Sequence, residues 1–189
     1  MSDSKGLVAA EVNQTLLTKY LEAELRSDHA GETGAVSIYR GIVAVARWRG
    51  DDELVAFATE HGKTESEHLR LIEDWLPQAR RSRLLGPWRL AGWLTGALPT
   101  LLGQRSVYAT IDAVETFVDK HYQQQIDHLE REGGPEGLKP LLLKCQADEC
   151  DHRDEARAKA GPTVPALVRA WCWLIGVGSA GAVVLARRV

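Results

Sequence analysis

The chain has 189 residues, of which 44% are hydrophobic and 26% charged, and its formal net charge is -3. This length can bury one sizeable core, so we expect a single domain over residues 1–189. A charge this close to neutral excludes the basic character of typical nucleic-acid-binding proteins, and no nucleic-acid partner is expected.

Strand signals are nearly absent, and the prolines lie at boundaries between long helix-compatible stretches, which predicts an all-α chain. Residues 1–14 have neither the apolar core of a secretory signal nor the arginine-rich character of a transit peptide. A turn with an Asp N-cap is expected at 49–53, and a helix stop and restart at 131–137. The predicted helices cover roughly residues 14–49, 52–76, 104–131, 138–160 and 166–186.

The three cysteines, Cys145, Cys150 and Cys172, form no CxxC pair and are odd in number. That pattern favours reduced thiols in a cytosol-like compartment over a disulfide framework. We therefore expect a bacterial cytoplasm, or the cytoplasmic face of a membrane.

Two of the six histidines have a glutamate three residues earlier: His68 follows Glu65, and His152 follows Glu149. Residues three apart on a helix point the same way, so each pair can bind one metal ion. A single pair of this kind is more often an exposed ion pair than a metal site. The alternatives are separated by what precedes each pair.

One conspicuous glutamate in a less polar setting lies upstream of each pair. Glu32 in DHAGETGAVSIY stands 33 residues before Glu65, and Glu115 in TIDAVETFV stands 34 residues before Glu149. The chain is therefore predicted to contain two similar helix hairpins, each offering Glu and then Glu-x-x-His. Four-helix proteins that bind two iron or manganese ions use this ligand pattern.

The charges of these residues also favour a metal site. Ionised glutamates on a core face need compensation, and four carboxylates balance two divalent ions if both imidazoles are neutral. Oxygen-rich sites with one imidazole per ion suit iron or manganese. By analogy with other sites of this pattern, Glu65 and Glu149 are expected to bridge the ions, while Glu32 and Glu115 each bind one.

Two apolar stretches stand apart from the four ligand-bearing helices. Residues 84–102 contain one charge in nineteen positions, residues 170–186 contain none in seventeen, and together they hold four of the six tryptophans. Tryptophan favours the membrane interface, and the second stretch is shorter than the ~20 residues of a membrane span. We expect segments at about 84–102 and 166–186 to attach to a membrane peripherally, at its interface. Burial in a soluble core is one alternative, and a membrane-spanning helix is another for the second stretch.

The segments LRSDHAGETGAVSIYRG (25–41), GALPTLLGQRSVYATIDAVETFVDKHYQQQI (96–126) and ADECDH (147–152) resemble the 5-demethoxyubiquinone hydroxylases of ubiquinone biosynthesis. The similarity covers roughly residues 20–186 and includes all six expected ligands. It implies a ferritin-like four-helix bundle with two iron ions per subunit, which uses O2 to hydroxylate the ring of a polyprenylated methoxy-benzoquinone. NADH is the implied source of electrons.

The resemblance also implies where the protein works. A polyprenyl quinone resides in the bilayer, so an enzyme acting on its ring docks there, which points to the cytoplasmic side of a bacterial inner membrane. A lipid-binding accessory protein and a homo-oligomer are further partners that such an enzyme could have.

Three residues are candidates for shaping the substrate pocket or moving protons, with ordinary packing as the alternative: Tyr39, His121 and Tyr122. Tyr122 lies seven residues after Glu115 and so shares its helix face. Three carboxylates are candidates for orienting the two histidine ligands, and the sequence does not choose among them: Asp28, Asp112 and Asp148.

Two rival functions stay open. A ferritin-like or rubrerythrin-like protein would oxidise iron or remove peroxide, but it has little use for two tryptophan-bearing apolar segments. A membrane scaffold without catalysis would not need the complete ligand set. The chain contains no glycine-rich dinucleotide fingerprint, so we expect no nicotinamide bound on a Rossmann unit.

Overall fold

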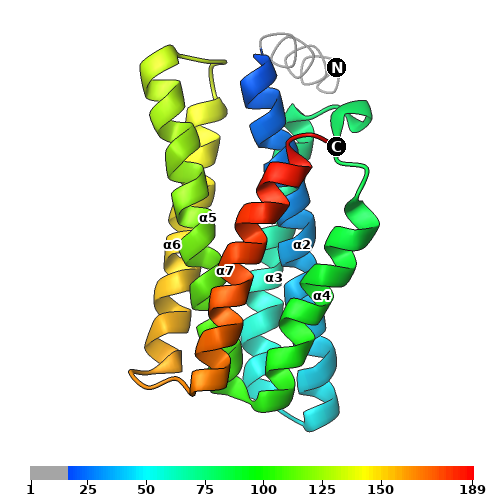
Figure 1. The fold of residues 1–189 in the computed structure, drawn as a ribbon, viewed down its shortest axis with the longest axis vertical. Helices are drawn as coiled ribbons and strands as arrows, with labels where there is room; N and C mark the ends of the chain where they lie inside the picture. The colour runs from blue at the N-terminus through cyan, green and yellow to red at the C-terminus, as the bar shows by residue number, and fades with distance from the viewer. Residues whose placement is uncertain (1–16) are drawn as a thin grey trace, which may run out of the picture.

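The computed structural model describes residues 17–189, and within this range its regular structure is entirely helical, as predicted (Figure 1). The part of the first expected helix at residues 14–16 lies outside the described residues. The three cysteines are free thiols. The elements are α2 (Lys19–Arg49), α3 (Asp52–Trp75), η1 (Gln78–Arg80), α4 (Leu85–Leu102), α5 (Gln104–Glu132), α6 (Leu138–Ala160) and α7 (Ala166–Ala186).

Local chemistry sets the boundaries of the first hairpin. Thr18 caps α2, because its hydroxyl accepts a hydrogen bond from the Leu21 N–H at 3.2 Å. Gly50 ends α2 with a φ of 69°, a left-handed conformation that favours glycine. Asp51 then accepts from the Leu54 N–H at 3.1 Å and starts α3, as the sequence predicted. The short turn lays α3 along α2 (Figure 1).

A second hairpin, α5 and α6, packs beside the first to complete a four-helix bundle (Figure 1). The apolar core of this bundle is divided into two clusters of buried side chains. One includes Ile42, Leu54 and Ile111, and the other includes Leu25 and Leu142. Along each of the four helices, buried polar residues lie between the stretches that build these two clusters. The bundle therefore has a polar middle layer.

Helix α4 connects the hairpins and lies against the outside of α2 in direct backbone contact. A Cβ atom at Gly92 would lie 2.2 Å from the carbonyl oxygen of Gly34, and one at Gly96 would lie 2.0 Å from that of Ile38. No residue larger than glycine fits at these two positions without a backbone shift. The glycines of the 84–102 stretch therefore serve this close packing.

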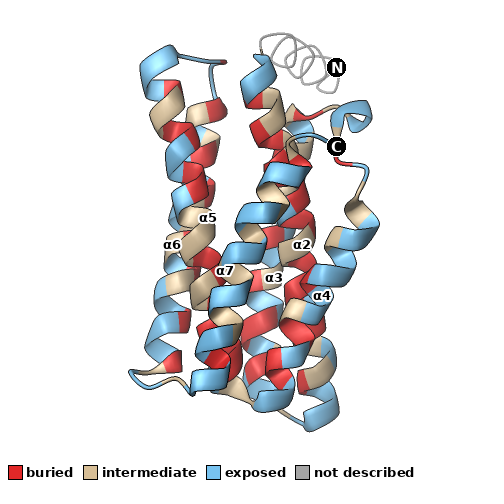
Figure 2. Ribbon diagram, viewed as in Figure 1, coloured by how far each residue is buried: buried red, intermediate tan, exposed pale blue. Residues whose placement is uncertain are grey.

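Helix α7 is buried only near its two ends, at Val168 and Ala186. Its length and composition would allow it to cross a membrane, and it is the one such helix in the described part of the chain. Figure 2 shows its outward face exposed, like much of α4. This rules out a core-helix role for α7. The exposed large apolar side chains of α4 and α7 are Leu90, Trp93, Leu94, Leu98, Leu101, Leu102, Leu167, Trp173, Leu174, Val177, Val184 and Leu185.

The C-terminal end of α7 is fastened to α2 by a buried carboxylate. Glu24 is 1% exposed, and Arg187 donates to its Oε2 from Nε at 3.0 Å and from Nη2 at 2.8 Å. Arg26 donates in turn to the carbonyl oxygen of Arg187 at 2.9 Å. These bonds tie the last turn of the apolar helix to the bundle.

Arg187→Met should loosen this end of α7, because Glu24 is left buried without its cation, at a cost of about 2 kcal/mol. Hydrogen exchange should speed up in residues 180–189 and stay unchanged in α3. The matched control is Arg188→Met, which changes an exposed neighbour that has no polar side-chain partner among the described residues. Equal exchange in the two variants would contradict the role given to Arg187.

Candidate metal centre

The six predicted ligands lie together in the polar middle layer of the bundle, and all six are buried. Helix α2 contributes the first glutamate and α5 the second, while α3 and α6 each contribute one Glu-x-x-His pair. The residues are Glu32, Glu65, His68, Glu115, Glu149 and His152. The two hairpins thus bring equivalent groups to one place, as the repeat predicted.

These residues form two overlapping groups of four, and within each group the potential ligand atoms all lie within 4.8 Å of one another. Glu65 and Glu149 belong to both groups. The first group is completed by Glu32 and His68, and the second by Glu115 and His152. Two neighbouring cation positions that share two carboxylates would need this arrangement.

Several atoms of the cluster are buried without a hydrogen-bond partner. They include Oε2 of Glu32, Oε1 of Glu65, Oε2 of Glu149 and Nδ1 of His152. The last of these atoms lies 3.1 Å from Glu65 Oε1 and 3.4 Å from Glu149 Oε2. Buried polar atoms nearly always have a hydrogen-bond partner. Several oxygen and nitrogen atoms without one, gathered in a single cluster, therefore fit a bound cation. The residues present therefore fit a pair of divalent metal ions.

Burial shifts the pKa values of the carboxyl groups in the cluster toward their protonated forms, with Glu149 as the exception. Burial and the Glu149 charge hold the pKa of Glu65 and of Glu115 well above the ordinary range, and burial raises that of Glu32 to about 7. Although burial opposes it, the hydrogen bond to Glu149 helps raise the pKa of His68 to about 9. Although burial acts against it, the nearby His152 and the hydrogen bond with His68 lower the pKa of Glu149. Glu149 is then the ionised member, paired with a His68 cation.

One carboxylate outside the cluster holds a histidine of the cluster. Asp148 Oδ2 lies 2.9 Å from His68 Nε2, which leaves Nδ1 of that ring facing the cluster. Lys144 donates to the same oxygen at 2.9 Å. Orienting contacts of this kind fix the ring and its tautomer. Of the three carboxylates considered from the sequence, Asp148 takes this role.

The other two candidates bind elsewhere. Asp28 Oδ1 contacts His121 Nε2 at 2.9 Å, and Asp112 accepts from Arg157 at 2.8 Å. In the described structure no carboxylate bonds to Nε2 of His152. The two histidines of the cluster are therefore held differently.

The two candidate tyrosines contact the cluster in a crossed arrangement. Tyr122 of α5 donates to Glu32 of α2 at 2.5 Å, and Tyr39 of α2 donates to Glu115 of α5 at 3.3 Å. Each tyrosine lies seven residues after the glutamate on its own helix. Burial and the neighbouring glutamate hold the pKa of each hydroxyl well above its usual value, so both stay protonated as donors.

His121 is buried but does not touch the six residues. Its Nε2 lies 2.9 Å from Asp28 Oδ1 and 3.1 Å from the Ser27 hydroxyl. Although burial opposes it, the bond to Asp28 raises the pKa of His121. His121 therefore lies one step away from the cluster, beside Tyr122.

His61 is a residue beside the cluster that was not among the candidates named from the sequence. It is buried, and its ring stacks on that of His152 with centroids 4.1 Å apart and planes 22° apart. Burial and the neighbouring His152 lower its pKa. Its position four residues before Glu65, on the same helix face, was the signal that could have identified it.

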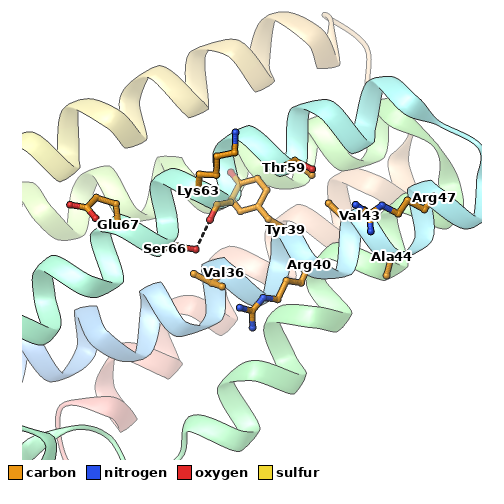
Figure 3. Close-up of a pocket in the computed structure, with 12 residues that line it drawn as sticks. Val36, Tyr39, Arg40, Val43, Ala44, Arg47, Thr59, Lys63, Ser66 and Glu67 are labelled. Atoms are coloured by element: carbon orange, nitrogen blue, oxygen red, sulfur yellow. Dashed lines mark hydrogen bonds between the residues drawn. The ribbon is translucent and has the colours of Figure 1, made fainter.

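A surface groove of about 670 Å³ runs between α2 and α3 outside the cluster (Figure 3). Tyr39 lines this groove with its ring, while its hydroxyl contacts Glu115 on the inner side. Arg40, Arg47 and Lys63 also line it, which gives it a basic character. Tyr39 thus separates an outer groove from the buried centre.

A helical bundle with four buried carboxylates and two imidazoles, arranged in two overlapping groups, defines the class of helical-bundle proteins able to hold a pair of metal ions. Within this class, residues 19–186 match the model of the family described as Ubiquinone biosynthesis protein COQ7, and the chain belongs to that family. The resemblance seen in the sequence is thereby confirmed.

Individual relatives agree with this family. The chain is 36% identical over 144 residues to the 3-demethoxyubiquinol 3-hydroxylase of Rhodospirillum rubrum, covering 75% of this chain and 66% of that protein. It is 30% identical over 189 residues to the mitochondrial NADPH-dependent 3-demethoxyubiquinone 3-hydroxylase of Dictyostelium discoideum, covering 98% and 85%. The like-named protein of Caenorhabditis elegans is 29% identical over 191 residues, covering 98% and 97%.

Proposed function

We propose that this chain hydroxylates the ring of a demethoxyubiquinone, a polyprenylated methoxy-benzoquinone, in ubiquinone biosynthesis, using O2 and two iron ions. The names of its relatives specify this hydroxylation. The observation that carries the proposal is the pair of overlapping groups that share Glu65 and Glu149. The bundle around it is of the ferritin-like kind, with α2, α3, α5 and α6 as its four helices.

Each residue of the centre has a role in holding the metals. Glu32 and His68 would bind one ion, Glu115 and His152 the other, and the two shared glutamates would bridge them. Four carboxylates and two neutral imidazoles balance two ferrous ions and match the oxygen-rich, one-imidazole preference of iron. When bound, such a pair supplies the reduction of O2 from which one oxygen atom reaches the ring.

The surrounding side chains position and shield the centre. Tyr122 donates to Glu32 and Tyr39 to Glu115, the two glutamates that would each bind a single ion. Each hydrogen bond uses one carboxylate oxygen and leaves the other for a cation. His121 keeps a proton between Asp28 and Ser27 close to Tyr122, where it can shape the substrate pocket or move a proton. The two apolar clusters on either side of the layer exclude water.

Electrons are proposed to come from NADH, with the quinone ring accepting them first. The mitochondrial relatives carry NADPH in their names, so both nucleotides belong in the test. The sequence has no Rossmann fingerprint, which favours a nucleotide that binds only in passing.

The apolar face of α4 and α7 supports peripheral attachment to a membrane interface, which we place on the cytoplasmic side of a bacterial inner membrane. Arg83 precedes α4 and Arg89 lies near its start, where they could meet anionic headgroups. A substrate with a polyprenyl tail would be collected there. A lipid-binding accessory protein and a second copy of the chain would use the same apolar face.

Replacing the exposed Trp173 and Leu174 by serine should weaken binding to phosphatidylglycerol vesicles at least about tenfold, because two large apolar side chains no longer enter the interface. Co-sedimentation measures the effect, and iron binding should be unchanged. The control Leu143→Ser removes an exposed apolar side chain from α6 and should bind like the wild type. Wild-type protein that does not co-sediment with the vesicles would refute membrane attachment.

One experiment tests the function directly. Anaerobically iron-loaded protein is mixed with demethoxyubiquinone, either nucleotide and isotopically labelled O2, and the quinone is weighed by mass spectrometry. The product should be one oxygen heavier and carry the label. Label from water would refute a monooxygenase, and oxidation of iron or loss of peroxide without a quinone product would instead support the ferritin-like alternative.

A further inference from the structure

We infer that His61, a residue outside the six-residue cluster, is a positioning residue that holds the His152 ring and so sets the affinity of one of the two metal positions. The inference rests on the proposed pair of metal ions. Its geometric basis is the ring stack of 4.1 Å and 22° between the two imidazoles. A stacked ring restrains the plane of its neighbour, which is what a ligand histidine needs to present a nitrogen in one direction.

His61 is itself fixed on three sides. Its Nε2 lies 3.0 Å from Glu155 Oε2, and its Nδ1 lies 3.5 Å from the Tyr39 hydroxyl. Phe57 packs against the ring with centroids 4.1 Å apart. A ring restrained in this way can restrain the next one, because it has no free rotamer of its own.

The repeat within the chain shows that this arrangement is specific to one half of the centre. Asp148, which holds His68, immediately precedes Glu149, but the equivalent residue before Glu65 is Thr64. A threonine carries no carboxylate, so the His152 ring lacks the charged support that Asp148 gives to the His68 ring.

The position of His61 is the other point where the two halves differ. His61 lies four residues before Glu65, and the equivalent position before Glu149 is Cys145. Helix α6 therefore carries a carboxylate and a thiol at these two positions, whereas α3 carries a threonine and a stacked imidazole. His68 is held by a hydrogen bond and His152 by a ring stack, which makes the two metal positions inequivalent.

The inequivalence can be measured by anaerobic titration with Co(II), followed by its visible absorption. Wild-type protein should bind two equivalents. His61→Ala should weaken one equivalent about tenfold or more and alter its absorption band, while the other keeps its affinity. His61→Phe restores an aromatic ring at this position and should bring the affinity back to within about threefold of the wild type.

Asp148→Ala is the matched control for the other half. It should weaken the equivalent that His61→Ala leaves intact, and the double variant should show both defects, because the two supports act on different rings. Circular dichroism and the thermal midpoint establish that each variant is folded.

Glu155→Ala keeps the test decisive if His61→Ala fails to fold. The Glu155 side chain is 47% exposed, so its removal leaves the core intact, and it should weaken the same equivalent several-fold. Unchanged binding in the folded variants, or an equal loss of both equivalents in His61→Ala, overturns the role of His61. A wild-type protein that binds fewer than two Co(II) ions would instead count against the proposed pair of metal positions.

Discussion

Glu149→Ala should abolish the binding of two iron ions and lower quinone hydroxylation more than about a hundredfold. Glu149 belongs to both four-residue groups, so its loss removes an oxygen ligand from each metal position at once. It also removes the partner of His68 Nδ1, now at 3.0 Å, and leaves that buried ring without its charge complement. Loss of an orienting residue alone typically costs 10–100-fold in metal affinity, and loss of a shared ligand should cost more.

Iron per chain, measured after anaerobic loading and desalting, is the primary readout, with turnover as the second. Asp151→Ala is the control, because this exposed carboxylate lies only two residues further along the same helix. It should keep full iron content and activity. A Glu149→Ala protein that still holds two irons and turns over normally would remove Glu149 from the centre.

The spacing of the ligands was predictable because helical geometry is rigid over short distances. Glu-x-x-His places two groups on one helix face whatever the rest of the chain does, and a hairpin repeat brings the second copy opposite the first. Glu32 and Glu115 were identifiable for the same reason. The four-helix arrangement therefore followed from local periodicity and the matched separations.

Contacts between helices could not be predicted in the same way. Asp28, Asp112 and Asp148 are alike in sequence, and the choice among them depends on the rotation of α6 against α3, which no single helix encodes. The crossed contacts of Tyr39 and Tyr122 also depend on how α2 faces α5. Each tyrosine was recognised as a candidate, but not as the partner of the opposite glutamate.

Composition was also an incomplete guide to burial. The stretches at 84–102 and 166–186 are similarly apolar, yet α4 packs its glycine backbone directly on α2 whereas α7 is buried only near its ends. The difference comes from the small residues that α2 presents to α4, such as Gly34 and Gly41. The small residues of α2 therefore decide which side of α4 is covered, and the composition of α4 alone does not reveal it.

Loading two divalent ions onto the metal-free protein should release about four protons per chain near pH 6. Glu65 and Glu115, whose pKa values are held well above the ordinary 4.5, each give up one proton. Glu32, with a pKa of about 7, gives up a third, and His68, with a pKa of about 9, gives up the fourth. The four lost protons match the charge of the two ions that replace them.

At pH 8 the release should be about one proton smaller than at pH 6, because Glu32 is then already ionised in the metal-free protein. Calorimetry in buffers of different ionisation enthalpy measures the number directly. Glu115→Gln should release one proton fewer at pH 6, since an amide has no proton to lose in this range. A release near zero at pH 6 would mean that the carboxyl groups are ionised without metal and would overturn this account of the cluster.

Protonation of the same groups makes the stability of the metal-free protein depend on pH, and bound metal should suppress this dependence. A carboxyl group whose folded-state pKa is raised contributes stability below its unfolded value of 4.5, and that contribution is lost as the pH rises through the folded value. For Glu32 the loss runs from about 4.5 to about 7 and for His68 from 6.5 to about 9, and the raised pKa values of Glu65 and Glu115 act in the same direction. The melting temperature of the metal-free protein should therefore fall from about pH 6.5 to pH 9, above the range in which the lowered pKa of His61 acts in the opposite direction. The loaded protein should show little of this fall, because the ions neutralise the carboxylates that the rising pH would otherwise leave buried and charged.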